Sequence, residues 1–111
     1  MPRDPRAAML DMVIAIETAV RLMGERSQAE FEADEENHWA VWSQIIILGE
    51  AAGRIPSEDQ SAMPEIPWST AIGMRHRLVH GYDSVDWGRV WKTVRDDLPG
   101  LKTQLDSRLG E

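Results

Sequence analysis

The stretch that decides the fold is residues 36–53, with the sequence ENHWAVWSQIIILGEAAG. It contains no proline, and its apolar side chains recur every three or four positions, which is typical of one face of an α-helix. The residues predicted to line that face are Trp39, Trp42, Ile45, Ile46, Gly49 and Ala52. Ile47 and Leu48 widen the face until the helix is apolar nearly all round. Such a helix is predicted to be buried on more than one side, centrally or in a subunit interface.

The same helical spacing continues on the N-terminal side of this stretch. It predicts a first helix over residues 4–23, with Gly24 as its end. Ser27 and Glu30 have the spacing of a capping box, which predicts a short second helix. On the C-terminal side, Ser57 is predicted to cap a short turn with Gln60 at the matching position.

Two prolines shape the middle of the chain. Residues 63–67 are predicted to be a connector, because Pro64 and Pro67 prevent a regular helix there. Pro67 suits the first position of another helix, which is predicted to run to about His80 and to end at Gly81.

The last predicted helix begins after Asp86, which is placed to cap it. Its apolar stripe consists of Trp87, Trp91, Val94, Leu98, Leu101 and Leu105. Because Pro99 falls within the stripe, we expect a kink or a brief break there. No stretch of the chain shows sustained two-residue alternation. The sequence therefore predicts an all-α, up-and-down bundle of four to five helices, forming one domain over residues 1–111.

The amino-acid composition indicates in which cellular compartment the protein is expected. There is no cysteine, which excludes a disulfide framework and a thiolate zinc site and fits a reducing compartment. The N-terminal residues are polar and lack the apolar segment of a signal peptide. The longest apolar run, residues 45–48, is far too short to span a bilayer. A cytoplasmic protein with no membrane segment is therefore expected.

Charge is distributed unevenly. The formal net charge of −7 argues against a general nucleic-acid coat protein. Residues 75–95 nevertheless contain five Arg or Lys residues and only two acids. This local excess fits either ordinary surface scatter or a phosphate site on an otherwise acidic body.

The chemistry is expected to lie in residues 74–82, with the sequence MRHRLVHGY. This stretch holds Arg75, His76, Arg77, His80 and the only tyrosine of the chain, Tyr82. Histidine transfers protons near neutral pH, and the guanidinium fork of arginine matches phosphate oxygens. Together they suit RNA cleavage, in which a base takes the proton of a 2′-hydroxyl and a cation stabilises the phosphate transition state.

Residue chemistry alone leaves alternatives open. The cations also suit the C-terminus of a helix, where the dipole favours positive charge. His76 and His80 have a spacing that binds zinc, but suitable further ligands are missing nearby, so no metal or other cofactor is expected. Arg75 and His80 lie about 140° apart around an ideal helix. A site that uses both needs the helix to end near His80, or two copies of the motif to meet.

The Arg-x4-His-x-Tyr pattern of Arg75, His80 and Tyr82 resembles the signature of HepT-like toxins of the HEPN superfamily. The similarity extends over nearly the whole chain. Residues 47–52 resemble the core of the third helix of that family, and residues 64–68 resemble its connector before the motif helix. The last helix of the family is resembled by residues 86–87, 90–91, 97–99 and 101–102.

The resemblance implies a HEPN-like homodimer whose cleft unites two motifs and cleaves RNA, such as tRNA or mRNA, without a metal. Arg75 would hold the scissile phosphate and His80 would be the general base or acid, with His76 and Arg77 in support. Tyr82 matches the tyrosine that an MntA-type nucleotidyltransferase antitoxin modifies with AMP. The expected secondary phosphate contacts are Arg77, Arg89, Lys92 and Arg95, at least half of which are expected to be surface charges only.

Two alternatives accompany this interpretation. The chain is either a ribonuclease toxin of a type II-like toxin–antitoxin pair or a non-catalytic binding module that pairs with a nucleotidyltransferase. Trp39, Trp42 and Trp68 fit a base-stacking platform or the core, and their helical setting favours the core.

Overall fold

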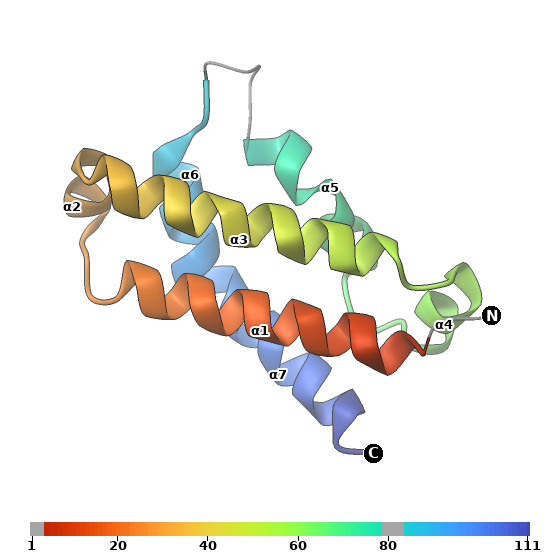
Figure 1. The fold of residues 1–111 in the computed structure, drawn as a ribbon. Coiled ribbons are helices and arrows are strands. Elements are labelled where there is room, and N and C mark those ends of the chain that lie inside the picture. Colours follow the sequence, from red (N-terminus) through yellow and green to blue (C-terminus); the bar gives the residue numbers. More distant parts are fainter. Residues whose placement is uncertain (1–3, 79–83) are drawn as a thin grey trace.

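The computed structural model describes residues 4–78 and 84–111, and these residues form an all-α bundle (Figure 1). The all-α prediction is confirmed. The elements are α1 (Pro5–Met23), α2 (Gln28–Ala33), α3 (Glu35–Gly53), α4 (Ser57–Ala62), α5 (Trp68–Leu78), α6 (Trp87–Lys92), a π-helical turn η1 (Thr93–Asp97) and α7 (Leu98–Leu109). Within the described ranges, no helix is long and apolar enough to cross a membrane.

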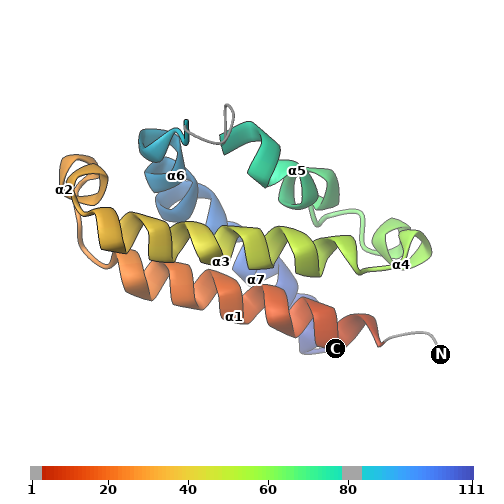
Figure 2. The ribbon, with the colours of Figure 1, turned by 45° about the horizontal axis from the view of Figure 1, so that its top comes forward.

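The centre of the bundle is the antiparallel pair α1 and α3, which lie side by side in both views (Figures 1 and 2). Arg54, just after α3, forms an ion pair with Asp11 near the start of α1, at 2.6 Å. At the other end of the pair, the Asn37 side chain donates to the backbone oxygen of Leu22 at 2.7 Å. The core between the helices includes the fully buried Met12, Ile16, Val41, Ile45, Leu48, Leu98 and Leu105.

Helix α3 is covered by α1 on one side and by α5 on another, so the prediction that it packs on more than one side is confirmed. Gly49 lies where α3 meets α5. A Cβ atom built on Gly49 would lie 3.4 Å from the backbone oxygen of Ala71 and 3.7 Å from that of Ile72, which is ordinary van der Waals contact. Alanine would therefore fit at this position, and only a longer side chain would push α5 away from α3.

The predicted ends of the first two helices are confirmed. Gly24 ends α1 with a φ of 57°, a conformation that L side chains rarely adopt. The Ser27–Glu30 capping box begins α2, with both of its reciprocal hydrogen bonds present. The prediction for Ser57 was wrong in detail, because Pro56 occupies the N-cap position and Ser57 is the first residue of a short helix, α4. The Gln60 side chain donates to the backbone oxygen of Ile55 instead.

The predicted distortion of the last helix is present, one turn before the proline. Asp86 caps α6 by accepting from the backbone N–H of Arg89 at 3.1 Å. The helix then widens into η1, where the N–H of Leu98 donates to the oxygen of Thr93, five residues earlier. Pro99 has no N–H to give to the preceding turn, which accounts for the altered hydrogen bonding there. The apolar stripe continues into α7.

One tryptophan departs from the predicted core. Trp42 and Trp68 are buried, but Trp39 is 46% exposed, so its assignment to the core was wrong. The Trp39 ring meets the ring of Trp87 edge to face, at 4.9 Å between centroids, and that of His38 at 6.0 Å. Ile47 is also exposed in the single chain.

Candidate active site

Helix α5 presents its C-terminal charges by burying the opposite side. Trp68 anchors the start of the helix, because its indole N–H donates to the backbone oxygen of Met63 at 3.1 Å. Ala71, Met74 and Leu78 then follow at helical spacing, and all three are buried in the core. The face between these residues must therefore point away from the bundle.

Arg75, His76 and Arg77 lie between these buried positions, and all three are exposed. Arg77 donates to the backbone oxygen of Thr70 at 3.4 Å. The Arg75 side chain makes no hydrogen bond or ion pair with other residues in the described ranges. The last turn of a helix also favours these cations through its dipole, which means that both predicted roles are physically compatible.

His80 and Tyr82, two residues of the predicted motif, lie outside the described residues. The predicted helix end at Gly81 and the pairing of His76 with His80 fall there too. Their predicted roles therefore stay predictions.

The described residues that follow position 83 contact the end of α5. The backbone N–H of Asp86 donates to the backbone oxygen of Leu78 at 2.9 Å, which places the start of α6 beside the end of α5. A cavity of about 230 Å³ lies at this junction. Its lining consists of Arg77, Leu78, Arg89, Lys92, Thr93, Asp96 and Asp97. Three of the predicted phosphate-contact residues, Arg77, Arg89 and Lys92, are thus brought to one place.

Arg95 is separated from this group. Its guanidinium carbon lies 5.2 Å from the centre of the Trp91 ring, a cation–π contact, and it does not line the cavity. This arrangement supports the surface role that was one of the two predictions for Arg95.

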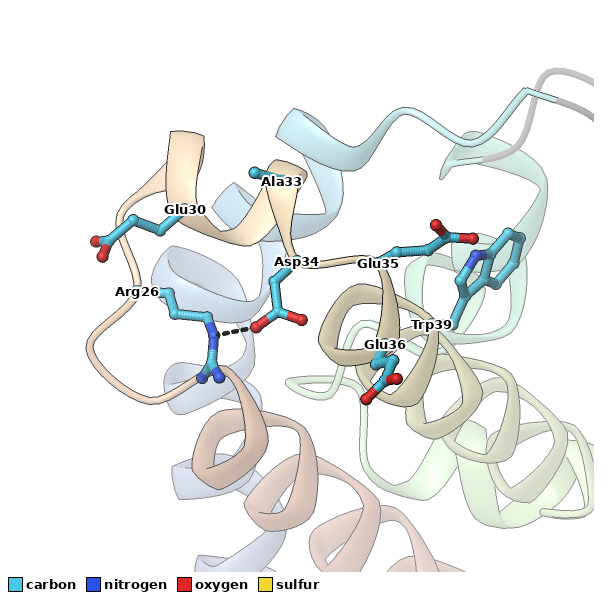
Figure 3. A pocket seen from close by; sticks show the side chains of 7 residues that line it. All are labelled: Arg26, Glu30, Ala33, Asp34, Glu35, Glu36 and Trp39. Atoms are coloured by element: carbon cyan, nitrogen blue, oxygen red, sulfur yellow. Dashed lines mark hydrogen bonds and ion pairs between the residues drawn. The ribbon is translucent and has the colours of Figure 1, made fainter.

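A larger and acidic hollow of about 1050 Å³ lies where α1, α2 and α3 meet (Figure 3). It is lined by Arg26, Glu30, Ala33, Asp34, Glu35, Glu36 and Trp39. Four carboxylates against one guanidinium would repel RNA phosphates, and the one cation is already paired with Asp34 at 3.1 Å. This hollow is therefore a poor candidate for the predicted chemistry.

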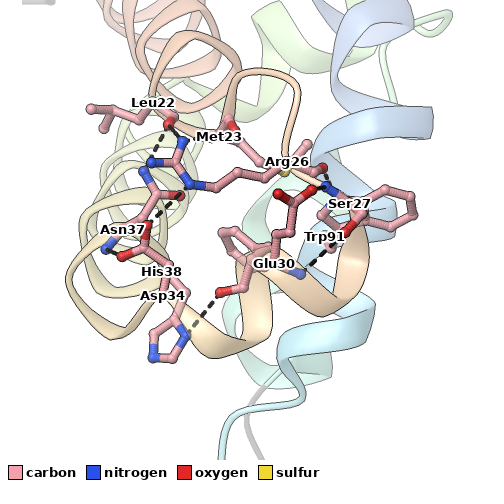
Figure 4. Close-up of polar contacts among 10 residues, drawn as sticks. Leu22, Met23, Arg26, Ser27, Glu30, Asp34, Asn37, His38 and Trp91 are labelled. Carbon is pink, nitrogen blue, oxygen red and sulfur yellow. Dashed lines mark hydrogen bonds and ion pairs between the residues drawn. The ribbon is translucent and has the colours of Figure 1, made fainter.

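The polar groups around Arg26 hold the corner together (Figure 4). Its side chain donates to the backbone oxygens of Leu22 and Met23 and to the Asp34 carboxylate. Its backbone oxygen accepts from the indole of Trp91 at 2.9 Å. The corner thus connects the end of α1 to the start of α3 and to α6.

Two carboxylates at this corner cap helices. The backbone N–H of Asn37, followed by the Arg26 side chain, lowers the pKa of Asp34. The backbone N–H and the hydroxyl of Ser27 lower the pKa of Glu30. Both carboxylates therefore accept hydrogen bonds from backbone N–H groups at the starts of helices.

Within the described ranges, no group of three or more His, Asp or Glu side chains is placed to hold a metal ion. His38 is buried, its ring stacks on that of Trp87 at 3.8 Å between centroids, and its Nδ1 lies 3.3 Å from the backbone oxygen of Phe31. It is a core histidine.

Sequence reasoning did miss part of the basic cavity. Thr93, Asp96 and Asp97 were not predicted to lie near the site, yet they line its wall. The only signal was the position of Pro99, because the π-helical turn before it is the element that carries these three residues.

The class of the protein follows from these features. A helical bundle whose fifth helix ends in exposed cations, followed in sequence by His80 and Tyr82, has the features of a HEPN-type domain. The family model described as "HepT-like: Ribonuclease HepT-like" matches residues 12–108. The chain therefore belongs to the ribonuclease HepT-like family.

Relatives agree with this assignment. A Thermococcus cleftensis protein named "Probable ribonuclease HepT" is 35% identical over 106 residues, which are 96% of this chain and 96% of that protein. A Caldanaerobacter subterraneus subsp. tengcongensis protein with a provisional RNase name is 34% identical over 103 residues, or 93% and 92% of the two chains. A Methanocaldococcus jannaschii protein with a similar name is 27% identical over 104 residues, or 94% and 95%. No solved structure matches the chain significantly.

Proposed function

We propose that this chain is a metal-independent ribonuclease toxin that acts in the cytoplasm on RNA such as tRNA or mRNA. The observation that carries the proposal is Arg75, an exposed cation at the end of α5 in a chain of the ribonuclease HepT-like family. A buried or paired arginine would have a structural role, whereas Arg75 is exposed and its side chain has no partner among the described residues.

The proposed reaction is attack of a ribose 2′-oxygen on the adjacent phosphorus. His80 removes the 2′-hydroxyl proton, the new P–O bond forms, and the bond to the 5′-oxygen breaks. That leaving oxygen takes a proton, from His80 or from its counterpart in a second subunit. Arg75 binds the non-bridging oxygens as their charge grows, and His76 orients Arg75 or the RNA.

A homodimer would bring two copies of Arg75 and His80 to one cleft. Exposed apolar side chains on the motif helix and its neighbour support such an interface. Ile72, on α5, is 39% exposed one turn before Arg75, and Trp39 and Ile47 are exposed on α3. Exposed residues of this kind on a small domain favour burial against a second copy.

We further propose that an MntA-type nucleotidyltransferase antitoxin silences the enzyme by transferring AMP to Tyr82. Each transfer joins the Tyr82 oxygen to the α-phosphorus of ATP and releases pyrophosphate. The product adds negative charge and bulk to the proposed RNA-binding motif, which opposes the binding of RNA phosphates. Since Tyr82 is the only tyrosine, Tyr82→Phe must abolish the added AMP mass seen after incubation with ATP and the partner.

The decisive experiment is cleavage of total RNA and tRNA by the purified chain in EDTA, beside His80→Ala. Cleavage that is lost in the variant supports the proposal. Cleavage retained in His80→Ala would contradict the assignment of the base, and loss of cleavage in EDTA would instead support a metal site. Absence of cleavage by the unmodified parent would favour a non-catalytic module that pairs with the nucleotidyltransferase.

The dimer has its own test. Ile72→Asp should give a monomeric mass by analytical ultracentrifugation and little cleavage, because the two motifs no longer meet. Ile14→Asp is the matched control, since Ile14 is 51% exposed on α1, away from the motif helix. A monomeric parent at micromolar concentration, or a monomer produced by Ile14→Asp alone, would contradict this interface.

A further inference from the structure

The cavity at the junction of α5 and α6 gathers cations from two separate elements. Arg77 comes from the end of α5, and Arg89 and Lys92 come from α6. They are brought together by tertiary structure, through the hydrogen bond between Asp86 and Leu78. With a volume of about 230 Å³, the cavity has room for one phosphate group and part of the attached ribose, but not for a larger ligand.

The three cations make few contacts that would stabilise the fold. None of them forms an ion pair with Asp96, with Asp97 or with any other residue in the described ranges. The Arg89 and Lys92 side chains are exposed and make no hydrogen bond to those residues, and that of Arg77 makes one, to Thr70. Against the two carboxylates of Asp96 and Asp97, the three cations leave an excess of one positive charge in the cavity, which favours an anionic ligand.

The position of the cavity suggests which anion it binds. Its lining includes Arg77, which follows Arg75 by two residues on α5 but lies about 200° from it around the helix, so the two side chains flank opposite sides of α5. An RNA strand that crosses the end of α5 would meet both cations. If Arg75 holds the scissile phosphate, a phosphate in this cavity belongs to a nearby nucleotide of the same strand. Asp96 and Asp97 on the wall would repel a second phosphate, so a single phosphodiester fits better than the chain of phosphates in a nucleoside triphosphate.

We infer that the cavity lined by Arg77, Arg89 and Lys92 is a second phosphate subsite, which binds a backbone phosphate of the RNA substrate and positions the strand for cleavage at Arg75. This inference rests on the proposed ribonuclease function for the identity of the ligand. Arg89 and Lys92 are positioning residues here, because they do not touch the reacting atoms.

The test measures binding apart from cleavage. The probe is a fluorescent single-stranded RNA of mixed sequence with every 2′-hydroxyl methylated, so that it keeps its phosphates but cannot be cleaved. Anisotropy titrations at several salt concentrations compare the parent with Arg89→Gln, Lys92→Gln and the double variant. The matched control is Arg95→Gln, which removes the same charge from the same helical segment but outside the cavity.

We expect each cavity variant to weaken binding about tenfold. Each should also lower the slope of log affinity against log salt by about 0.7, because one phosphate contact is lost from a single strand. With cleavable tRNA, KM should rise while kcat changes little. Arg95→Gln should leave the salt slope near that of the parent.

Three results would overturn the inference. One is an equal effect of Arg95→Gln and the cavity variants, which would mean general charge attraction. Another is loss of AMP or inorganic phosphate binding with no change for RNA, which would mean a mononucleotide site. The last is no RNA binding by the parent. The proposed function fails separately, if the parent cleaves no RNA, and the anisotropy data then still decide whether the subsite exists.

Discussion

The acidic hollow at the α1–α2–α3 corner and the basic cavity at the α5–α6 junction differ in how their charges are used. In the hollow, Arg26 makes three side-chain hydrogen bonds, and Glu30 and Asp34 cap helices. In the cavity, the Arg89 and Lys92 side chains have no partner in the part of the chain that the structure describes. The larger hollow is thus a structural feature, and the smaller cavity is the better ligand site. The two sites are distinguished by whether their charged side chains have partners within the protein, and not by their volume.

The largest effect is expected for the cation nearest the proposed chemistry. Arg75→Ala should lower kcat by about 10²–10³, because it removes a donor that stabilises the developing phosphate charge. The melting temperature should stay close to that of the parent, since Arg75 is exposed and has no partner among the described residues. Single-turnover cleavage and thermal unfolding measure the two effects.

Arg75→Lys is the matched control, because it keeps the charge but loses the bidentate fork. We expect an activity between those of the parent and the alanine variant. A fall in melting temperature as large as the fall in activity would show that Arg75 is structural, and the contrast between the two regions would then fail.

The reverse pattern is expected for Arg26. Arg26→Met should destabilise the fold by about 1–2 kcal/mol, because the backbone oxygens of Leu22 and Met23 and the Asp34 carboxylate lose a donor. Urea unfolding measures this free energy. Cleavage below the melting temperature should be unchanged. If Arg26→Met impaired cleavage without destabilising the chain, the acidic hollow would belong to the site after all.

Most of the fold was predictable because its signals are local. The capping box at Ser27 and the glycine at position 24 act within a few residues of themselves, and both predictions were correct. Trp39 was assigned wrongly because helical spacing cannot say how far a neighbouring helix extends to cover a side chain. That limit is tertiary, and it is overcome only when Trp87 is seen to cover one side of the ring.

The site was predictable to a smaller extent. The chemistry of residues 75–77 was evident from the residue types, and the family resemblance gave each its role. The sequence did not show that Arg77 meets Arg89 and Lys92 while Arg95 is excluded. That selection depends on the Asp86–Leu78 hydrogen bond and on the phase of the helix entering its π-helical turn, neither of which follows from spacing alone.

The smallest effect is expected for Arg108, which, like Arg26, forms an ion pair within the protein. Arg108 pairs with Glu65 through two hydrogen bonds, at 2.5 and 2.9 Å, and this contact lowers the pKa of Glu65 to about 2. The carboxylate is therefore charged in the folded state at pH values where it is protonated in the unfolded chain. Its contribution to stability is complete above the unfolded value of 4.5 and is lost as the pH falls towards 2.

Urea midpoints measured between pH 6 and pH 2 should consequently decline less steeply in Glu65→Gln than in the parent. The difference should be small, because the pair is solvent-exposed and screened. Arg89→Gln is the contrasting variant, since its pH dependence should follow that of the parent throughout. An identical decline in the parent and in Glu65→Gln would show that the ion pair does not persist in solution. Proximity to a carboxylate would then not be enough to tell a cation held in a structural ion pair from one that can bind a ligand. The coupling energy between the two charges would have to be measured for each pair.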